Sequence, residues 1–260
     1  MAAPRAPAGG PESDPLTSDA ITASFRLLQR RRGHRFSIDD LATAFEAARA
    51  RPDAARYLDL GCGVGSVLLM VSYRIPRARV FGIEAQEISF ALAQRNVEEN
   101  GLSEQVTLRL GDLRELTREF PPEPCDLVSG TPPYLPPGTA LASPDPQRAA
   151  ARIELRGGVE DYLAAAARVL APAGRVVVCA DGRAPERVLG GAARAGLTPL
   201  RRLDVIAREG AAGPLFSVWT AARAGDVVAG ALDHEVVVMR DAKGERTEAG
   251  SEMRRFFGLG

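Results

Sequence analysis

From residue 56 onward, hydrophobic positions alternate between the period of a strand and the period of a helix. Short apolar runs predict strands, and they cover residues 56–60, 78–83, 106–110, 125–129 and 175–179. Apolar residues spaced three and four apart predict helices between them, at residues 64–74, 87–100, 158–170 and 184–195. This alternation predicts an α/β fold, with a parallel sheet covered by helices on both faces.

The late part of the chain carries weaker strand patterns. Residues 198–206 and 215–220 flank a glycine-containing loop and predict an antiparallel hairpin at the edge of the sheet. With it the sheet has seven predicted strands, and the main domain spans residues 53–224. Residues 225–260, which include a strand-like run at 235–240 and a basic end, predict a small C-terminal appendage. A hairpin packed on the core and a substrate-contact role are both open for this appendage.

The N-terminal part divides into a leader and a cap. Residues 1–15 are rich in Ala, Pro and Gly, which predicts a disordered leader. Three apolar residues spaced for one helix face predict an amphipathic helix over residues 18–30. Ser37 is a suitable N-cap for a second helix over residues 38–50. We therefore expect a helical cap over residues 16–52.

Composition excludes several classes of protein. Hydrophobic residues make up 45% of the chain and charged residues 25%, and the net charge is zero, so only a local basic patch would support nucleic-acid binding. The three cysteines form no CxxC pair, and there are only two histidines, so neither a disulfide framework nor a metal site is expected. No apolar run is long enough to span a bilayer. These features predict a cytoplasmic protein with no metal and no membrane partner.

The most specific signal is a glycine-rich turn between the first predicted strand and its helix. Asp59 lies just before Gly61, Gly63 and Gly65. Glycine lets the backbone approach a ligand closely, whereas a carboxylate here would repel the phosphates of a dinucleotide. Ser66 also stands where a dinucleotide fingerprint needs Gly or Ala, so a dehydrogenase is disfavoured. The cationic sulfonium and amino groups of S-adenosylmethionine (SAM) suit Asp59, and an ordinary tight turn is the alternative.

Two further acids follow the next two predicted strands. Glu84 ends the second strand, where a carboxylate can accept from both hydroxyls of a ribose. Asp112 follows the third strand, where it can accept from an adenine amino group while Leu113 lines the ring. A helix-capping role is the alternative for Asp112.

A proline-rich tetrapeptide follows the fourth predicted strand. Its residues are Thr131, Pro132, Pro133 and Tyr134. Paired prolines occur on both sides of it, so the prolines alone mean little. Its position is informative, because open α/β sheets bind ligands at the carboxyl ends of their strands.

The order of these motifs resembles that of class I SAM-dependent methyltransferases with their Rossmann-like fold. The tetrapeptide looks like the Asn-Pro-Pro-Tyr motif of the branch that methylates amino groups. Flanking residues are similar to those of the bacterial tRNA (adenine-N6)-methyltransferase family. They are residues 16–19, Gln29, residues 33–39, residues 151–154, residues 238–241 and Gly244. The resemblance covers the chain from about Leu16 onward.

The resemblance implies SAM-dependent methylation of adenine N6 in tRNA or another RNA. The first motif side chain and the Pro132 carbonyl would accept from the two N–H groups of the amine, and Tyr134 would stack on the flipped-out base. Asp39 would lie near the amino-acid end of SAM, although a helix-start acid is equally open. The implied substrate contacts are Arg32, Arg35 and Arg152, for which a solvated charge run is the alternative.

One departure from the family motif leaves the substrate open. Thr131 stands where the family has Asn, and it offers one hydroxyl on a short branched stem in place of an amide. Methylation of a protein glutamine amide or a small molecule is therefore a second hypothesis, which zero net charge favours. A SAM-binding module with little activity is a third.

Overall fold

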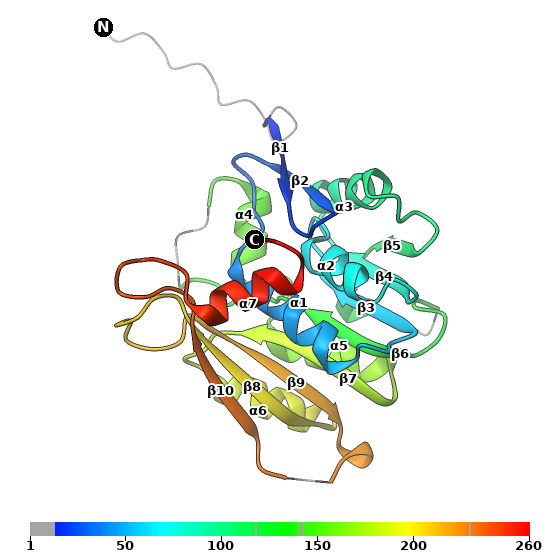
Figure 1. The fold of residues 1–260 in the computed structure, drawn as a ribbon. Coiled ribbons are helices and arrows are strands. Elements are labelled where there is room, and N and C mark those ends of the chain that lie inside the picture. Colours follow the sequence, from blue (N-terminus) through cyan, green and yellow to red (C-terminus); the bar gives the residue numbers. More distant parts are fainter. Residues whose placement is uncertain (1–13, 118, 140, 142, 229) are drawn as a thin grey trace, which may run out of the picture.

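The computed structural model describes residues 14–260 except 118, 140, 142 and 229, so the predicted leader lies almost wholly outside the described residues. Its centre is an eight-stranded sheet with strand order β10-β8-β9-β7-β6-β3-β4-β5 (Figure 1). The strands are β3 (Arg56–Leu60), β4 (Arg79–Glu84), β5 (Val106–Leu110), β6 (Cys125–Gly130), β7 (Leu170–Ala180), β8 (Leu197–Ile206), β9 (Phe216–Arg223) and β10 (Asp233–Val238).

Helices cover both faces of this sheet. They are α1 (Ile38–Ala50), α2 (Ser66–Arg74), α3 (Glu87–Glu99), α4 (Pro146–Arg152), α5 (Val159–Val169), α6 (Pro185–Arg194) and α7 (Glu248–Phe256), with short 3₁₀ turns at Leu113–Glu115 and Ala224–Asp226. Helix α1 begins after Ser37 as predicted, and the backbone N–H of Ser37 donates to the Asp40 carboxylate at 2.9 Å. Among the described residues, no helix is both long and apolar enough to cross a membrane.

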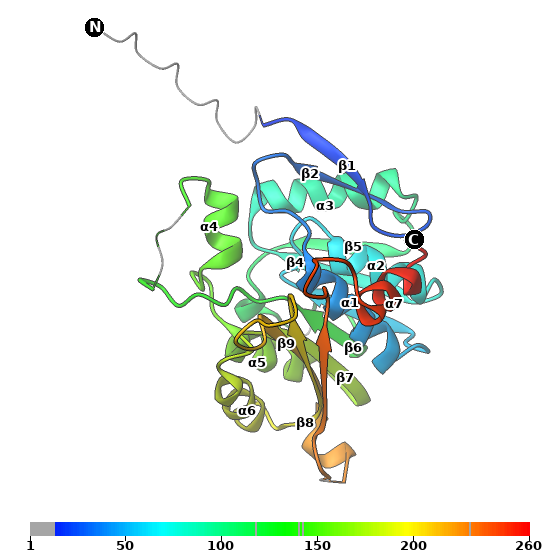
Figure 2. The same cartoon turned by 60° about the vertical axis from the view of Figure 1, so that its left-hand side comes forward.

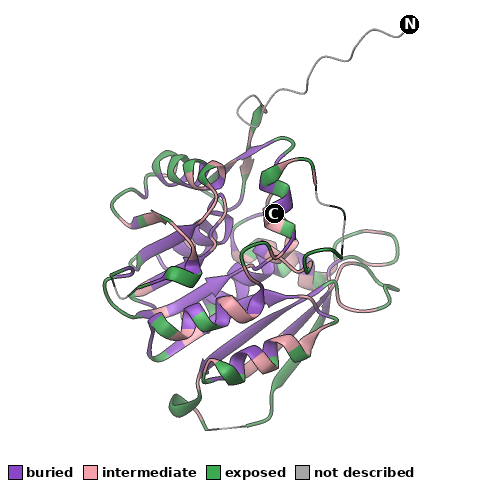
Figure 3. Ribbon diagram, turned by 180° about the vertical axis from the view of Figure 1, so that it is seen from behind, coloured by how far each residue is buried: buried purple, intermediate pink, exposed green. Residues whose placement is uncertain are grey.

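Successive residues of each central strand belong to two separate cores. Tyr57 and Leu127 lie in the core formed with α1 and α2, whereas Leu58 and Val128 lie in the core formed with α5 and α6. This is the period-two pattern expected of strands buried on both faces. Figure 3 shows the result, since the strands are buried while the outer faces of the helices are exposed.

The sheet has one strand more than predicted. Strands β8 and β9 are antiparallel as expected, but the hairpin does not end the sheet, because β10 pairs in parallel with β8. The C-terminal segment thus supplies the outermost strand, and α7 lies beside α1 (Figure 1). The rings of Phe256 and Phe45 meet edge to face at 4.9 Å. Strand β10 pairs with β8 because the edge of β8 would otherwise expose unpaired backbone groups, which a short strand can satisfy.

The predicted helix over residues 18–30 is wrong. This segment is an antiparallel hairpin of β1 (Leu16–Ala20) and β2 (Arg26–Arg30), which lies across α3 (Figure 2). Two side chains of α3 explain the difference. Asn96 accepts from Leu28 N–H at 2.7 Å and donates to its carbonyl at 3.0 Å, and Asn100 does the same for Arg26 at 2.8 Å. These amides pair with β2 much as a further strand would, which the local sequence does not reveal.

Candidate active site at the carboxyl edge of the sheet

The candidate site lies where the strand order changes direction. Chain order runs outward from β3 to β4 and β5 on one side, and β6 lies on the other side of β3. The register pairs Leu60 with both Ile83 and Gly130. The residues that follow these strands therefore meet at one edge, the place where open α/β sheets bind ligands.

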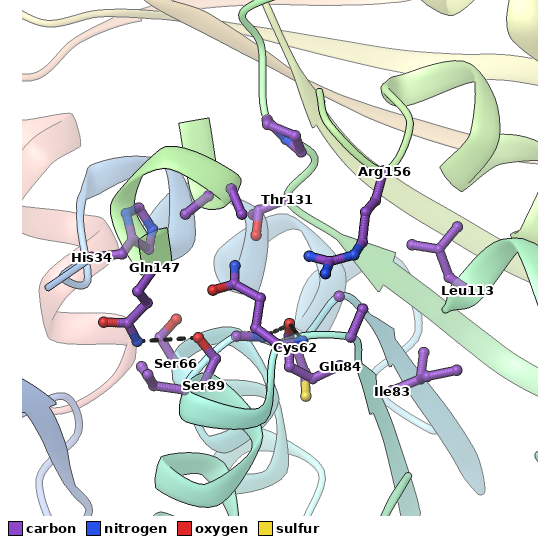
Figure 4. Close-up of a pocket in the computed structure, with 18 of the residues that line it drawn as sticks. His34, Cys62, Ser66, Ile83, Glu84, Ser89, Leu113, Thr131, Gln147 and Arg156 are labelled. Atoms are coloured by element: carbon purple, nitrogen blue, oxygen red, sulfur yellow. Dashed lines mark hydrogen bonds between the residues drawn. The ribbon is translucent and has the colours of Figure 1, made fainter. Parts of the chain in front are cut away.

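A cleft at this edge encloses about 910 Å³, including its open mouth. Seven of the predicted site residues line it: Gly61, Gly63, Glu84, Asp112, Leu113, Thr131 and Pro133. Figure 4 shows Glu84 and Cys62 on one side of the cleft and Thr131 facing them across it.

The glycine-rich turn has the conformation that its glycines allow. Gly61 and Gly63 have φ of +58°, and Gly65, with φ of +92°, precedes the first residue of α2. A Cβ on Gly61 would overlap the Tyr162 hydroxyl, whereas a Cβ on Gly63 would meet nothing within 4 Å. The turn is thus held against α5 at Gly61, while it is open to the cleft at Gly63.

The strand-end carboxyls are buried. Asp59 lies behind the turn, where the Ser129 hydroxyl donates to it at 2.6 Å, and burial raises its pKa to about 7. Glu84 accepts backbone N–H groups from Gly63 at 2.9 Å and Gln86 at 2.7 Å. Burial also raises the pKa of Glu84. A bound cation would stabilise the ionised form of such carboxyls.

One acid of this cleft was missed in the sequence. Asp40 lines the cleft and is buried, whereas Asp39, the predicted cofactor contact, lines a neighbouring cavity. Burial, and then the nearby Asp39 charge, raise the pKa of Asp40 well above its usual range. The Ser37-x-x-Asp40 spacing at the start of α1 was an available signal, because it places the fourth residue against the helix cap.

The position of Asp112 is compatible with both roles considered for it, helix capping and adenine binding. Its carboxylate caps the 3₁₀ turn by accepting from Arg114 N–H at 2.9 Å, and it pairs with the Arg114 guanidinium at 2.6 Å. It also lines the cleft next to the buried Leu113. Adenine binding by these two residues stays a prediction.

A second cavity opens on the other side of Thr131. It encloses about 1140 Å³ including open solvent, and Thr131 and Pro133 line both spaces. Its lining residues are His34, Arg35, residues 37–40, residues 131–135, Ala151, Arg152, Asp181, Arg183, Leu215 and Phe216. We call it the substrate cavity.

The tetrapeptide is anchored by its tyrosine. The Tyr134 hydroxyl donates to Asp39 at 2.9 Å and lies 2.7 Å from Cys179 Sγ. The ring is half-buried at the wall of the substrate cavity, so stacking on a base stays a prediction. Of the predicted substrate contacts, Arg35 and Arg152 line this cavity, while Arg32 is exposed on the surface.

Two basic residues near Thr131 were not predicted. His34 lines both spaces, and burial lowers its pKa. Arg156 reaches into the cleft between Thr131 and Leu113 (Figure 4). His34 lies within residues 33–39, which carry part of the family resemblance, but no motif in the sequence marked Arg156, because it is placed by a loop whose path depends on the rest of the fold.

The loop over residues 135–156 contains helix α4 and is bound to the hairpin. The buried Arg30 guanidinium pairs with Asp145 at 2.8 Å and donates to Gln147 at 3.1 Å. Gln147 in turn donates to the Ser89 hydroxyl at 3.1 Å (Figure 4). Arg30 is therefore committed to holding α4 beside the cleft and is not available for phosphate contacts.

The residues of the cleft fit SAM. The glycine turn leaves room for a ligand, Glu84 and Asp112 offer oxygen acceptors for hydroxyl and amino groups, and buried carboxyls favour a cation. In the described part of the chain, no three His, Cys, Asp or Glu side chains are grouped as a metal site.

The cleft-forming part of the chain matches a known family. A sequence model described as "Methyltransferase domain" matches residues 52–188, just over half of the chain. A predicted O-methyltransferase from Agrobacterium tumefaciens has the same fold, with a TM-score of 0.62 at 16% identity over 86% of this chain and 98% of that chain.

Curated relatives fall into two groups by substrate. The tRNA1(Val) (adenine(37)-N6)-methyltransferase of Porphyromonas gingivalis is 32% identical over 123 residues, which cover 46% of this chain and 48% of that protein. The release factor glutamine methyltransferase of Geobacter sulfurreducens is 35% identical over 158 residues, which cover 58% and 54%. The chain thus matches about half the length of each relative.

Proposed function

Because the chain belongs to the methyltransferase-domain family, with SAM as its methyl donor, we propose that it methylates adenine N6 in tRNA or another RNA. The observation that carries the proposal is the position of Thr131 and Pro133, which line both the cofactor cleft and the substrate cavity. An amine held by this segment lies at the boundary between the two spaces, where transfer has to occur.

In the cofactor cleft, each predicted residue matches one part of the SAM molecule. Bound SAM supplies a methyl group on a positively charged sulfur. Glu84 would hold the ribose hydroxyls, and Asp112 and Leu113 the adenine. The buried Asp59 and Asp40 would favour the positive end of the molecule.

On the substrate side, Thr131 and Pro132 would act by positioning. An exocyclic adenine amine is a poor nucleophile because its lone pair is delocalised into the ring. The Thr131 hydroxyl and the Pro132 carbonyl each accept one N–H, which draws the nitrogen toward tetrahedral geometry and directs its lone pair at the cleft. Such alignment supplies most of the acceleration, so no strong general base is needed.

A protein glutamine amide is the second candidate. The Geobacter sulfurreducens relative is named for that reaction. A glutamine amide is planar and has two N–H groups, as the adenine amine has, so the same pair of acceptors suits both. RNA is favoured by Arg152 at the substrate cavity, since guanidinium groups bind phosphates. Arg35 and Arg183 line the same cavity but pair with Asp19 and Asp181, each at 3.0 Å.

Labelled SAM distinguishes these candidates. The protein is incubated with methyl-labelled SAM and either unmodified bulk tRNA or bacterial release factor, and the products are digested to nucleosides or peptides. Label in N6-methyladenosine supports the proposal. Label only in a glutamine peptide replaces it with the second candidate. Binding of SAM with no label in either pool would overturn both and leave a small-molecule substrate or a SAM-binding module.

A further inference from the structure

A third cavity lies apart from the reaction described above. It encloses about 620 Å³ including open solvent, and it lies between the start of α1, the end of β10 and α7. Its lining residues are Phe36, Ser37, Ile38, Leu41, Met239, Arg240, Arg246, Gly250 and Arg254. We call it the C-terminal cavity.

Three arginines line the C-terminal cavity, and among the described residues none of them pairs with an Asp or Glu side chain. Arg240 donates to the Gly244 carbonyl at 2.7 Å, and Arg254 donates to the main-chain oxygen of Gly260 at 3.3 Å. Burial, and then the Arg246 charge, lower the pKa of Arg254, and its buried Nε has no hydrogen-bond partner among the described residues. The neighbouring Arg255 differs, because it pairs with Glu248. A cluster of guanidinium groups without an acidic side chain favours an anion.

Four of the other residues that line the cavity are apolar. Phe36, Ile38, Leu41 and Met239 form an apolar wall, and an aromatic ring beside aliphatic side chains suits the flat face of a base. A simple inorganic anion would leave this apolar wall exposed. A nucleotide would contact both parts, with its phosphate on the arginines and its base on the wall.

The cavity adjoins the substrate cavity. Ser37 and Ile38 line both, so the two spaces lie on either side of the same short segment. An RNA strand that places one adenosine at Thr131 has its neighbouring nucleotides close to this segment.

We propose that the C-terminal cavity binds a nucleotide that flanks the methylated adenosine, through its phosphate and its base. This inference rests on RNA being the substrate. It assigns to the C-terminal segment a part in substrate recognition, beyond completing the sheet.

Three variants test the assignment. Arg246→Gln removes an exposed charge with little risk to folding, and Arg254→Gln removes a half-buried one. Arg255→Gln is the matched control, since it makes the same change one residue along the same helix. The affinity for unmodified tRNA is measured by fluorescence anisotropy in saturating S-adenosylhomocysteine across a salt series. The affinities for uridine 5′-monophosphate and for uridine are measured by calorimetry.

The expected result separates the first two variants from the control. Arg246→Gln and Arg254→Gln should each weaken tRNA binding about 3- to 10-fold and make the slope of log affinity against log salt shallower by about one. Arg255→Gln should change neither quantity. Uridine 5′-monophosphate binds the wild type more tightly than uridine does, and this preference is lost in Arg246→Gln.

Other outcomes overturn the assignment. Equal tRNA affinities of Arg246→Gln and Arg255→Gln would exclude the cavity from RNA recognition, even if the nucleotide preference changed. Failure of the proposed function is seen separately, as absence of N6-methyladenosine while the binding differences between variants persist.

Discussion

The cofactor cleft and the substrate cavity share Thr131 but are built in different ways. About half of the residues that line the cleft end or directly follow four neighbouring strands, at positions 61–64, 66, 83–86, 111–113 and 131. Most of the others come from the segment around the start of α1 and from residues 147–162. The substrate cavity joins segments far apart in the sequence, around residues 34–40, 131–135, 151–152, 181–183 and 215–216. In the proposed function, the cofactor is therefore held in large part by motifs that are visible in the sequence, whereas the substrate is bound by segments that only the fold brings together.

The two spaces also differ in charge. Buried carboxyls surround the cleft, which suits a cationic cofactor. Arginines stand around the substrate cavity, although Arg183 is paired with Asp181 at 3.0 Å. A change in one region is therefore expected to affect cofactor and substrate unequally, and the following variants test this separation.

The largest expected effect is on the stability of the glycine-rich turn. Gly61→Ala should lower the free energy of unfolding by about 3 kcal/mol, because overlap with Tyr162 and left-handed strain both destabilise the folded turn. Gly63→Ala is the matched control, since it has the same φ but open space, and it should cost only the strain of about 1 kcal/mol. Denaturant unfolding measures both changes, and equal losses would contradict the tight contact at Gly61.

A variant at Asn96 should loosen the N-terminal hairpin from the glycine-rich turn of the cleft. Its side chain joins Leu28 of the hairpin to the Val64 carbonyl of the glycine-rich turn, at 2.7 and 2.8 Å. Asn96→Ala leaves these buried backbone groups unpaired and should lower the free energy of unfolding by about 2 to 4 kcal/mol. Asn100→Ala, which frees less buried groups, should cost about 1 kcal/mol. Denaturant unfolding compares them, and equal losses would contradict the bridging role.

Thr131→Ala should affect turnover and not cofactor binding. Loss of one acceptor to the substrate amine should reduce kcat about 10- to 100-fold, or about 1.4 to 2.7 kcal/mol. Thr131→Ser keeps the hydroxyl and should retain most of the activity. If Thr131→Ala turned over its substrate as fast as the wild type, the acceptor role of Thr131 would be wrong.

The smallest effect concerns pH. Because burial raises the pKa of Asp59 to about 7, this carboxyl is largely neutral below that pH, and binding a cation then has to release its proton. SAM affinity should therefore rise a few-fold between pH 6 and pH 8, the direction set by a raised carboxyl pKa. Asp59→Asn should flatten this dependence. A profile that falls with rising pH in the wild type would contradict the proposed role of the buried acids.

The failures of prediction have a common cause. The helix predicted over residues 18–30 became a hairpin because Asn96 and Asn100, some 70 residues away, bind its backbone. Asp40 was missed because burial, and not residue type, distinguishes it from Asp39. In each case the deciding partner lies outside the local segment.

The sequence by itself determined the alternation of strands and helices, the glycine-rich turn and the identity of the cofactor. These depend on periodicity and on backbone conformations that neighbouring residues fix. Only the tertiary structure decided that β10 joins the sheet, that Arg30 fastens α4 beside the cleft, and that Arg246 and Arg254 meet in one cavity. Each of these is a contact between distant segments, and its free energy comes from burial and pairing that exist only once the chain has folded.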